Sequence, residues 1–144
     1  MAQQLKTQYE FLFVGRDQGS FVENYAYDLG DGEENGGKVF INLEIEQNKV
    51  DADKIGEIIF DNLRKIFYAD LTIDPYDRFE ESLKEVNKAL NAYRQERGSD
   101  FLGKMNVLIV AVVNNQIYVT QTGDAEAYLI RRKFITSISD GLDE

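Results

Sequence analysis

The sequence lacks cysteine and histidine entirely and contains a single proline. Without cysteine, the chain can form no disulfide and no thiolate metal site. Without histidine, it can form neither a Ser-His-Asp triad nor a histidine-ligated zinc site. Any bound metal ion would therefore be held by oxygen atoms, which favours magnesium, manganese or calcium. The absence of cysteine also fits a reducing compartment, and we expect a cytoplasmic protein.

Long apolar runs are also absent. No stretch of about 18 apolar residues occurs, and residues 1–8 lack the apolar part of a signal peptide, so we expect no membrane association. A Gly-rich phosphate loop of the Walker type is missing as well. The net charge of −10, from 26 acidic and 16 basic residues, repels phosphate backbones and disfavours nucleic-acid binding. The same charge favours solubility and suits a hard cation or a basic partner.

The first third of the chain has the pattern of β-strands. Apolar and aromatic runs at 9–14 and 21–29 predict two strands, and a turn region with four glycines follows at 28–37. Residues 38–46 then alternate, with Phe40 as the one apolar residue on the polar side, which predicts a third strand with one wet face. Its apolar positions are Val39, Ile41, Leu43 and Ile45.

The hydrophobic period changes after residue 50. Apolar residues now recur at helical spacing, which predicts an amphipathic helix with one buried face. Asp51 or Asp53 can cap the start of this helix. The apolar positions of this face are Ile55, Ile58, Ile59, Leu63, Ile66 and Phe67.

A second helix has clearer boundaries. Asp74 suits the N-cap, Pro75 suits the first helical position, and Gly98 suits the end of the helix. Glu80 and Lys84 form a favourable pair four residues apart. The apolar stripe of this helix is Phe79, Leu83, Val86, Leu90 and Tyr93. Two heptads are too few for a coiled coil, so we expect the stripe to pack on a sheet or on the first helix.

The last part of the chain returns to strands, at 105–113, 116–122, 125–131 and 134–138. Asn114-Asn115 suits a two-residue hairpin turn, because asparagine tolerates a positive φ. The second hairpin carries a basic tip at 131–133, which is either a polar turn or a grip for a phosphate or an acidic partner. Strands segregated from a helix pair predict an α+β fold, with both helices on one face of a mostly antiparallel sheet. We expect residues 1–144 to form a single domain.

Residues 117–131 read Ile-Tyr-Val-Thr-Gln-Thr-Gly-Asp-Ala-Glu-Ala-Tyr-Leu-Ile-Arg. This segment resembles Leu-Tyr-Val-Ala-Asn-Val-Gly-Asp-Ser-Arg-Ala-Tyr-Leu-Ile-Arg of the metal-dependent type 2C serine/threonine protein phosphatases. The order of the predicted elements also resembles the N-terminal half of that family. The resemblance implies that Asp124 lies near a metal cluster. The residues alone allow a second interpretation, in which Asp124 only hydrogen-bonds the turn that Gly123 makes.

The other acidic motifs of that family are degraded in this sequence. Where the family has Asn-Glu-Asp-Ala, this chain has Asn24 and Tyr25 in place of both acids, and Glu23 is a shifted remnant. Where the family has Ala-Asp-Gly-Met-Gly-Gly-His, Glu44 stands at the essential aspartate and Ile45 at the metal-binding glycine. The resemblance therefore leaves Glu44 and Asp124 as the candidate metal ligands, and no catalytic residue.

These departures suggest a catalytically degenerate phosphatase-like domain, a pseudophosphatase, that acts as a binding or regulatory module. It would require no cofactor, although magnesium or manganese could bind at the two carboxylates. Its partner would be another protein or a second copy in a homodimer. The alternative is an active magnesium- or manganese-dependent serine/threonine phosphatase completed by other residues or chains. A third hypothesis, an N-terminal-nucleophile hydrolase, would need a propeptide cut to expose a nucleophile, because the chain starts Met-Ala.

The predicted strands are too few for the two full sheets that the resemblance implies. An apolar sheet face would then lie open to solvent, which folded proteins avoid over large areas. We expect a second copy, or a curling of the strands into one sheet, to cover it. The residues assigned to this face are Val107, Ile109, Ala111, Val119 and Leu129.

Overall fold

The computed structural model describes residues 20–27, 36–46, 49–98 and 105–138. The predicted strand at 9–14 lies outside the described residues. The elements, in chain order, are β1 (Ser20–Tyr27), β2 (Lys38–Glu46), α1 (Lys49–Phe67), α2 (Pro75–Arg97), β3 (Met105–Val113), β4 (Gln116–Thr122), β5 (Tyr128–Arg131) and β6 (Phe134–Ser137).

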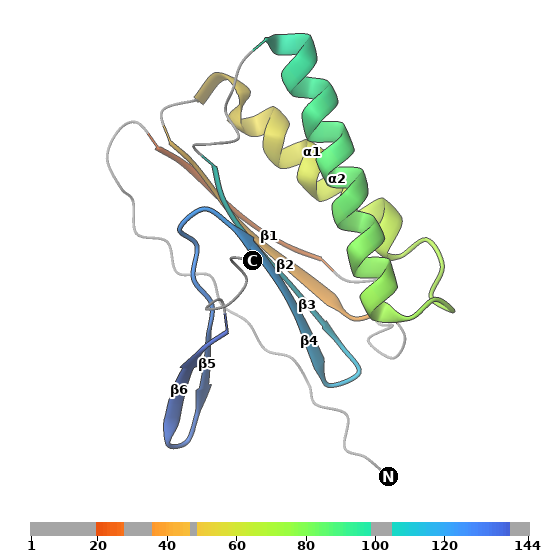
Figure 1. The fold of residues 1–144 in the computed structure, drawn as a ribbon, viewed down its shortest axis with the longest axis vertical. Helices are drawn as coiled ribbons and strands as arrows, with labels where there is room; N and C mark the ends of the chain where they lie inside the picture. The colour runs from red at the N-terminus through yellow and green to blue at the C-terminus, as the bar shows by residue number, and fades with distance from the viewer. Residues whose placement is uncertain (1–19, 28–35, 47–48, 99–104, 139–144) are drawn as a thin grey trace.

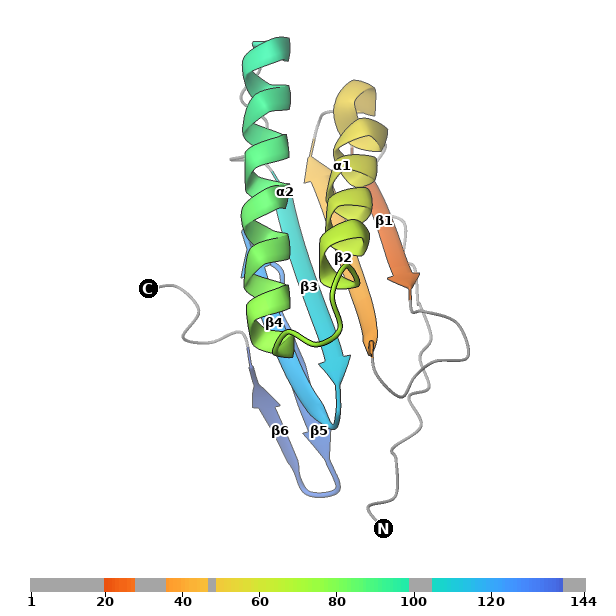
Figure 2. The same cartoon turned by 90° about the vertical axis from the view of Figure 1, so that its right-hand side faces the viewer.

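The described strands form two antiparallel sheets. One has the order β1-β2-β3-β4, and the other is the hairpin β5-β6 (Figure 1). Both helices lie side by side over one face of the larger sheet, as Figure 2 shows. The predicted α+β class is therefore confirmed. Neither helix of the described part has an apolar stretch long enough to cross a membrane.

The connection between β3 and β4 is the predicted asparagine turn. Asn114 and Asn115 have φ angles of 50° and 64°. A two-residue hairpin turn of type I′ needs a positive φ at both central positions, and asparagine reaches this region at lower strain than most residues. Val113 and Gln116 pair directly across this turn, which sets the register of the whole hairpin.

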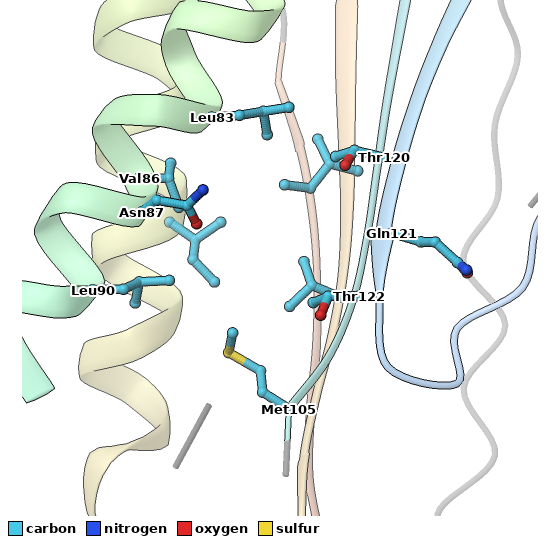
Figure 3. A pocket seen from close by; sticks show the side chains of 11 residues that line it. Leu83, Val86, Asn87, Leu90, Met105, Thr120, Gln121 and Thr122 are labelled. Carbon is cyan, nitrogen blue, oxygen red and sulfur yellow. The ribbon is translucent and has the colours of Figure 1, made fainter. Parts of the chain in front are cut away.

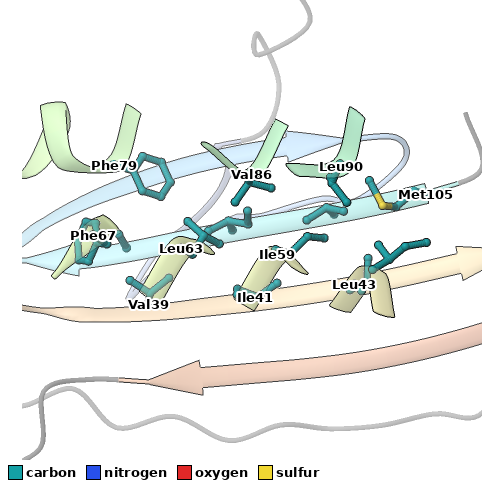
Figure 4. Close-up of a cluster of buried hydrophobic side chains, with 14 of the residues drawn as sticks. Val39, Ile41, Leu43, Ile59, Leu63, Phe67, Phe79, Val86, Leu90 and Met105 are labelled. Atoms are coloured by element: carbon teal, nitrogen blue, oxygen red, sulfur yellow. The ribbon is translucent and has the colours of Figure 1, made fainter. Parts of the chain in front are cut away.

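The main hydrophobic core lies between the larger sheet and the two helices (Figure 4). Strand β2 shows the predicted alternation, but the face expected to be wet is half-buried except at Glu46, and β3 alternates between buried and half-buried positions in the same way. Burial of this apolar layer is the main favourable contribution to folding. The sheet contributes Val39, Ile41, Leu43, Ile45, Met105, Val107, Ile109, Ala111 and Val113; the helices contribute Ala52, Ile55, Ile59, Leu63, Phe67, Phe79, Val86 and Leu90.

The expectation for the open sheet face was wrong. Val107, Ile109 and Ala111 are at most 5% exposed, because they face the helices. Val119 pairs with Val110, which lies between Ile109 and Ala111 on β3 and points to the opposite face. Val119 therefore points to that opposite face as well. A strand with apolar residues at nearly every position carries no periodicity that distinguishes its two faces, so the sequence could not assign them.

Helix α2 has the predicted ends. The Asp74 carboxylate accepts a hydrogen bond of 2.9 Å from the Tyr76 backbone N–H, and Pro75 is the first helical residue. Gly98 ends the helix in the left-handed region, with φ 66°. The predicted ion pair on the exposed face is present, with 3.6 Å between the Lys84 ammonium and the Glu80 carboxylate.

Helix α1 departs from the expectation at its start. It begins at Lys49, so neither Asp51 nor Asp53 caps it. Asp51 lies in the first turn and is buried, and its Oδ1 accepts hydrogen bonds from the Tyr93 hydroxyl (2.5 Å) and from Arg97 Nε (3.1 Å). The carboxylate therefore joins the start of α1 to the end of α2, a contact that spans 42 residues of sequence.

The other end of α1 is held by a buried arginine. Arg78 is 3% exposed, and its Nη1 donates a 2.9 Å hydrogen bond to the carbonyl of Phe67, the last residue of α1. Its guanidinium carbon lies 4.6 Å from the centroid of the Phe67 ring. Burial lowers the pKa of this guanidinium, which nonetheless remains a cation at neutral pH. A positive charge at this point is favourable, because a helix C-terminus carries partial negative charge.

We expect Arg78→Ala to lower the free energy of unfolding by about 3 kcal/mol, because it removes a charged hydrogen bond and leaves a cavity. Arg78→Met should lower the free energy of unfolding by about 1–2 kcal/mol less than Arg78→Ala does, because methionine fills the space without a buried charge. Urea denaturation measures both. Arg64→Ala, at an exposed position of α1, serves as the control and should change stability by less than about 0.5 kcal/mol. Equal stability of Arg78→Ala and this control would show that Arg78 does not stabilise the end of α1.

The Asp51–Tyr93 contact should make stability sensitive to alkali. The hydrogen bond to Asp51 raises the pKa of the Tyr93 hydroxyl, so the folded state holds this proton more tightly than the unfolded chain. The contribution is fully present below the ordinary phenol pKa of about 10 and is lost as the pH rises through the folded value. The stability difference between the parent protein and Tyr93→Phe should therefore be constant from pH 7 to 9 and shrink above pH 10. A difference that stays constant or grows there would refute this role.

Candidate functional site

The first candidate ligand, Glu44, lies near the C-terminal end of β2. It alternates with the buried residues Leu43 and Ile45, so it points to the sheet face away from the helices, where it is half-buried. Asn106 is its direct partner on β3. The side-chain Nδ2 of Asn106 donates a 3.2 Å hydrogen bond to Glu44 Oε2.

The second candidate, Asp124, lies in the turn after β4. Its backbone N–H donates a 2.9 Å hydrogen bond to Asn106 Oδ1. The two ends of one amide therefore hold both candidates: the nitrogen of Asn106 contacts the Glu44 carboxylate, and its oxygen contacts the backbone of Asp124. The Asp124 residue is exposed.

Gly123 makes this arrangement sterically feasible. Its φ is 71°, in the left-handed region that favours glycine. A Cβ at this position would collide with Asn106 Oδ1 and lie 2.9 Å from the Met105 carbonyl oxygen. The Gly-Asp pair singled out in the sequence thus has a structural role, because it lets the turn approach the start of β3 closely.

Two further positions that the resemblance singled out, Tyr25 and Ile45, do not lie on the sheet face that carries Glu44. Tyr25 packs on the helix side of the sheet, with its ring centroid 5.3 Å from that of Phe60 in α1. Ile45 is fully buried in the core between the sheet and the helices. Asn24 is described only by its backbone, which pairs with Asn42. The structure therefore brings Glu44 and Asp124 together through Asn106, and it places Tyr25 and Ile45 on the other face.

Two amide residues of this face were missed by the sequence reasoning. Asn106 interrupts an otherwise apolar strand, which was the available signal. Gln121 pairs with Leu108 and alternates with Thr120 and Thr122 of β4. The Oε1 atom of Gln121 is buried and has no hydrogen-bond partner among the described residues. Such an acceptor is uncommon in folded proteins.

This site has few groups for metal chemistry. Nowhere in residues 20–27, 36–46, 49–98 and 105–138 do three acidic side chains gather closely enough to hold a metal ion. Two carboxylates and an amide oxygen are suitable ligands for one hard cation. A catalytic pair of divalent ions needs more negative charge than these groups supply.

A groove of about 300 Å³ opens on the other side of the sheet, between α2 and the strands β3 and β4 (Figure 3). Leu83, Val86 and Leu90 line it from the helix, and Thr120 and Thr122 line it from β4. Its lining contains no ionisable side chain, so it can hold an apolar group but cannot perform acid–base chemistry.

The hairpin β5-β6 exposes large apolar side chains. Ile130, Phe134 and Ile135 are each at least 70% exposed, and Tyr128 is 52% exposed. Figure 1 shows the hairpin projecting away from the sheet and helices. Clustered apolar exposure of this kind is typical of interaction surfaces.

The chain matches no protein-family model, no curated protein and no solved structure.

We expect Gly123→Ala to destabilise the protein by roughly 3 kcal/mol, from backbone strain together with the collision with Asn106. Gly98→Ala is the matched control, because Gly98 has a similar φ of 66° with nothing near its Cβ position. It should lose only about 1 kcal/mol. Thermal unfolding compares the two. Equal losses would show that Asn106 does not press against the turn.

Proposed function

We propose that this chain is a type 2C phosphatase-like domain without phosphatase activity, which acts as a binding or regulatory module. The observation that carries the proposal is the Asn106 side chain. It spans the space between Glu44 and the backbone of Asp124, with hydrogen bonds of 3.2 Å and 2.9 Å. The Glu44 carboxylate is thus tied to a structural amide, and the same amide holds the backbone of Asp124.

The chemistry of the resembled family supports the same conclusion. A two-metal phosphatase holds its ions about 3.5–4 Å apart, and the ions activate a water for in-line attack on the phosphate. Several carboxylates must offset the repulsion between the ions. Glu44 is one methylene longer than aspartate, and Tyr25, which replaces an acid, is turned to the other face of the sheet. The domain therefore requires no cofactor. Magnesium or manganese would bind only weakly, with roughly millimolar affinity, between Glu44 and Asp124.

The exposed hairpin supports the binding part of the proposal. A domain that exposes Ile130 and Ile135 as a direct cross-strand pair gains free energy when a partner covers them. The partner is another protein or a second copy of this chain.

One observation favours the alternative, an active enzyme completed by other residues or chains. Glu44 and Asp124 come from distant elements, yet both contact the same Asn106 side chain. Two ligands of one ion would also converge in this way.

Hydrolysis of p-nitrophenyl phosphate with millimolar manganese separates the two functions. We expect no turnover above background for the parent protein, for Glu44→Gln or for Asp124→Asn. Asp53→Asn, at an exposed position of α1, serves as the control. Turnover that disappears in Glu44→Gln and Asp124→Asn, but not in the control, would establish the active enzyme instead.

A further inference from the structure

The hairpin β5-β6 exposes a pair of apolar side chains, Ile130 and Ile135, which are 73% and 71% exposed. Ile130 pairs with Ile135 and Tyr128 pairs with Ser137, so these four side chains share one face. Within the described chain, β5 and β6 pair only with each other. An isolated two-stranded hairpin is marginally stable in water, so this element gains from being covered.

Charge is distributed unevenly along the same hairpin. Three exposed cations, Arg131, Arg132 and Lys133, form its tip, and residues 128–138 contain no acid. Two exposed acids, Asp124 and Glu126, lie directly before its base. The Tyr128 hydroxyl donates a 2.5 Å hydrogen bond to Glu126 Oε2, which fixes that carboxylate beside the start of β5. The hairpin is therefore positive at the tip and negative at the base.

We propose that two copies of this chain associate through their hairpins, packed antiparallel about a two-fold axis. This arrangement brings the apolar faces together and places each basic tip beside the acidic base of the partner. An interface with two-fold symmetry requires one surface that is complementary to itself, and the hairpin has that property in both apolarity and charge. The inference rests on the proposed function as a binding module and names its partner.

Other occupants fit the hairpin less well. An acidic peptide would match the tip but would meet Asp124 and Glu126 at the base. An anionic membrane would attract the three cations, yet the same two acids and the net charge of −10 would repel it. A second hairpin matches both ends at once, because opposite charges then face each other at two equivalent places.

Sedimentation of the purified protein, without metal or substrate, tests the proposal. The chain has a mass of 16.5 kDa, and we expect a species of twice that mass at micromolar concentration. Replacing Ile130 and Ile135 by serine should weaken the association about tenfold or more. Ile73→Ser is the matched control, since Ile73 is 46% exposed elsewhere on the molecule, and it should leave the association unchanged.

Charge exchange tests the antiparallel geometry. A tip variant, Arg132→Glu with Lys133→Glu, and a base variant, Asp124→Lys with Glu126→Lys, should each sediment mainly as monomers, because like charges then meet. An equimolar mixture should recover the dimer, because every tip again faces an opposite base.

Three results would overturn the proposal. The first is a parent protein that stays monomeric at about 100 μM, a concentration far above the expected dissociation constant. The second is that the charge variants dimerise like the parent. The third is that the equimolar mixture of the two charge variants stays monomeric. Binding of the parent monomer to an acidic peptide or to anionic vesicles would identify the other occupants. Phosphatase activity has no bearing on these outcomes, so failure of the dimer and failure of the proposed function are distinguishable.

Discussion

The apolar layer between the sheet and the two helices is the constraint on which the rest of the structure depends. Alternation along β2 commits Val39, Ile41 and Leu43 to this layer. Because successive side chains of a strand point to opposite faces, Glu44, which follows Leu43, lies on the opposite face. The position of the candidate site is therefore a consequence of core packing.

On that opposite face, one amide organises the polar groups. Asn106 is neutral, so it satisfies the Glu44 carboxylate and the Asp124 backbone without adding charge. Such an amide gives both groups a hydrogen-bond partner, and it is a weaker ligand for a cation than a carboxylate. Function resides in the site and not in the fold, so the proposed loss of metal chemistry is compatible with an intact core.

Local signals in the sequence predicted the fold where the relevant physics is local. Asp74, Pro75 and Gly98 marked the ends of α2 correctly, and Asn114-Asn115 marked a hairpin turn. Contacts between distant segments could not be read in the same way. Asp51 resembled a helix cap, but Tyr93 and Arg97, 42 and 46 residues away, hold it within the helix. The role of Asn106 likewise depends on the register between β2 and β3, which no local pattern encodes.

A crystal structure grown with millimolar manganese tests the central claim most directly. The account predicts that Asn106 keeps both hydrogen bonds, and that at most one weakly bound ion lies between Glu44 and Asp124. Two manganese ions about 3.5–4 Å apart, bridged by a water and with the Asn106 amide displaced, would contradict it.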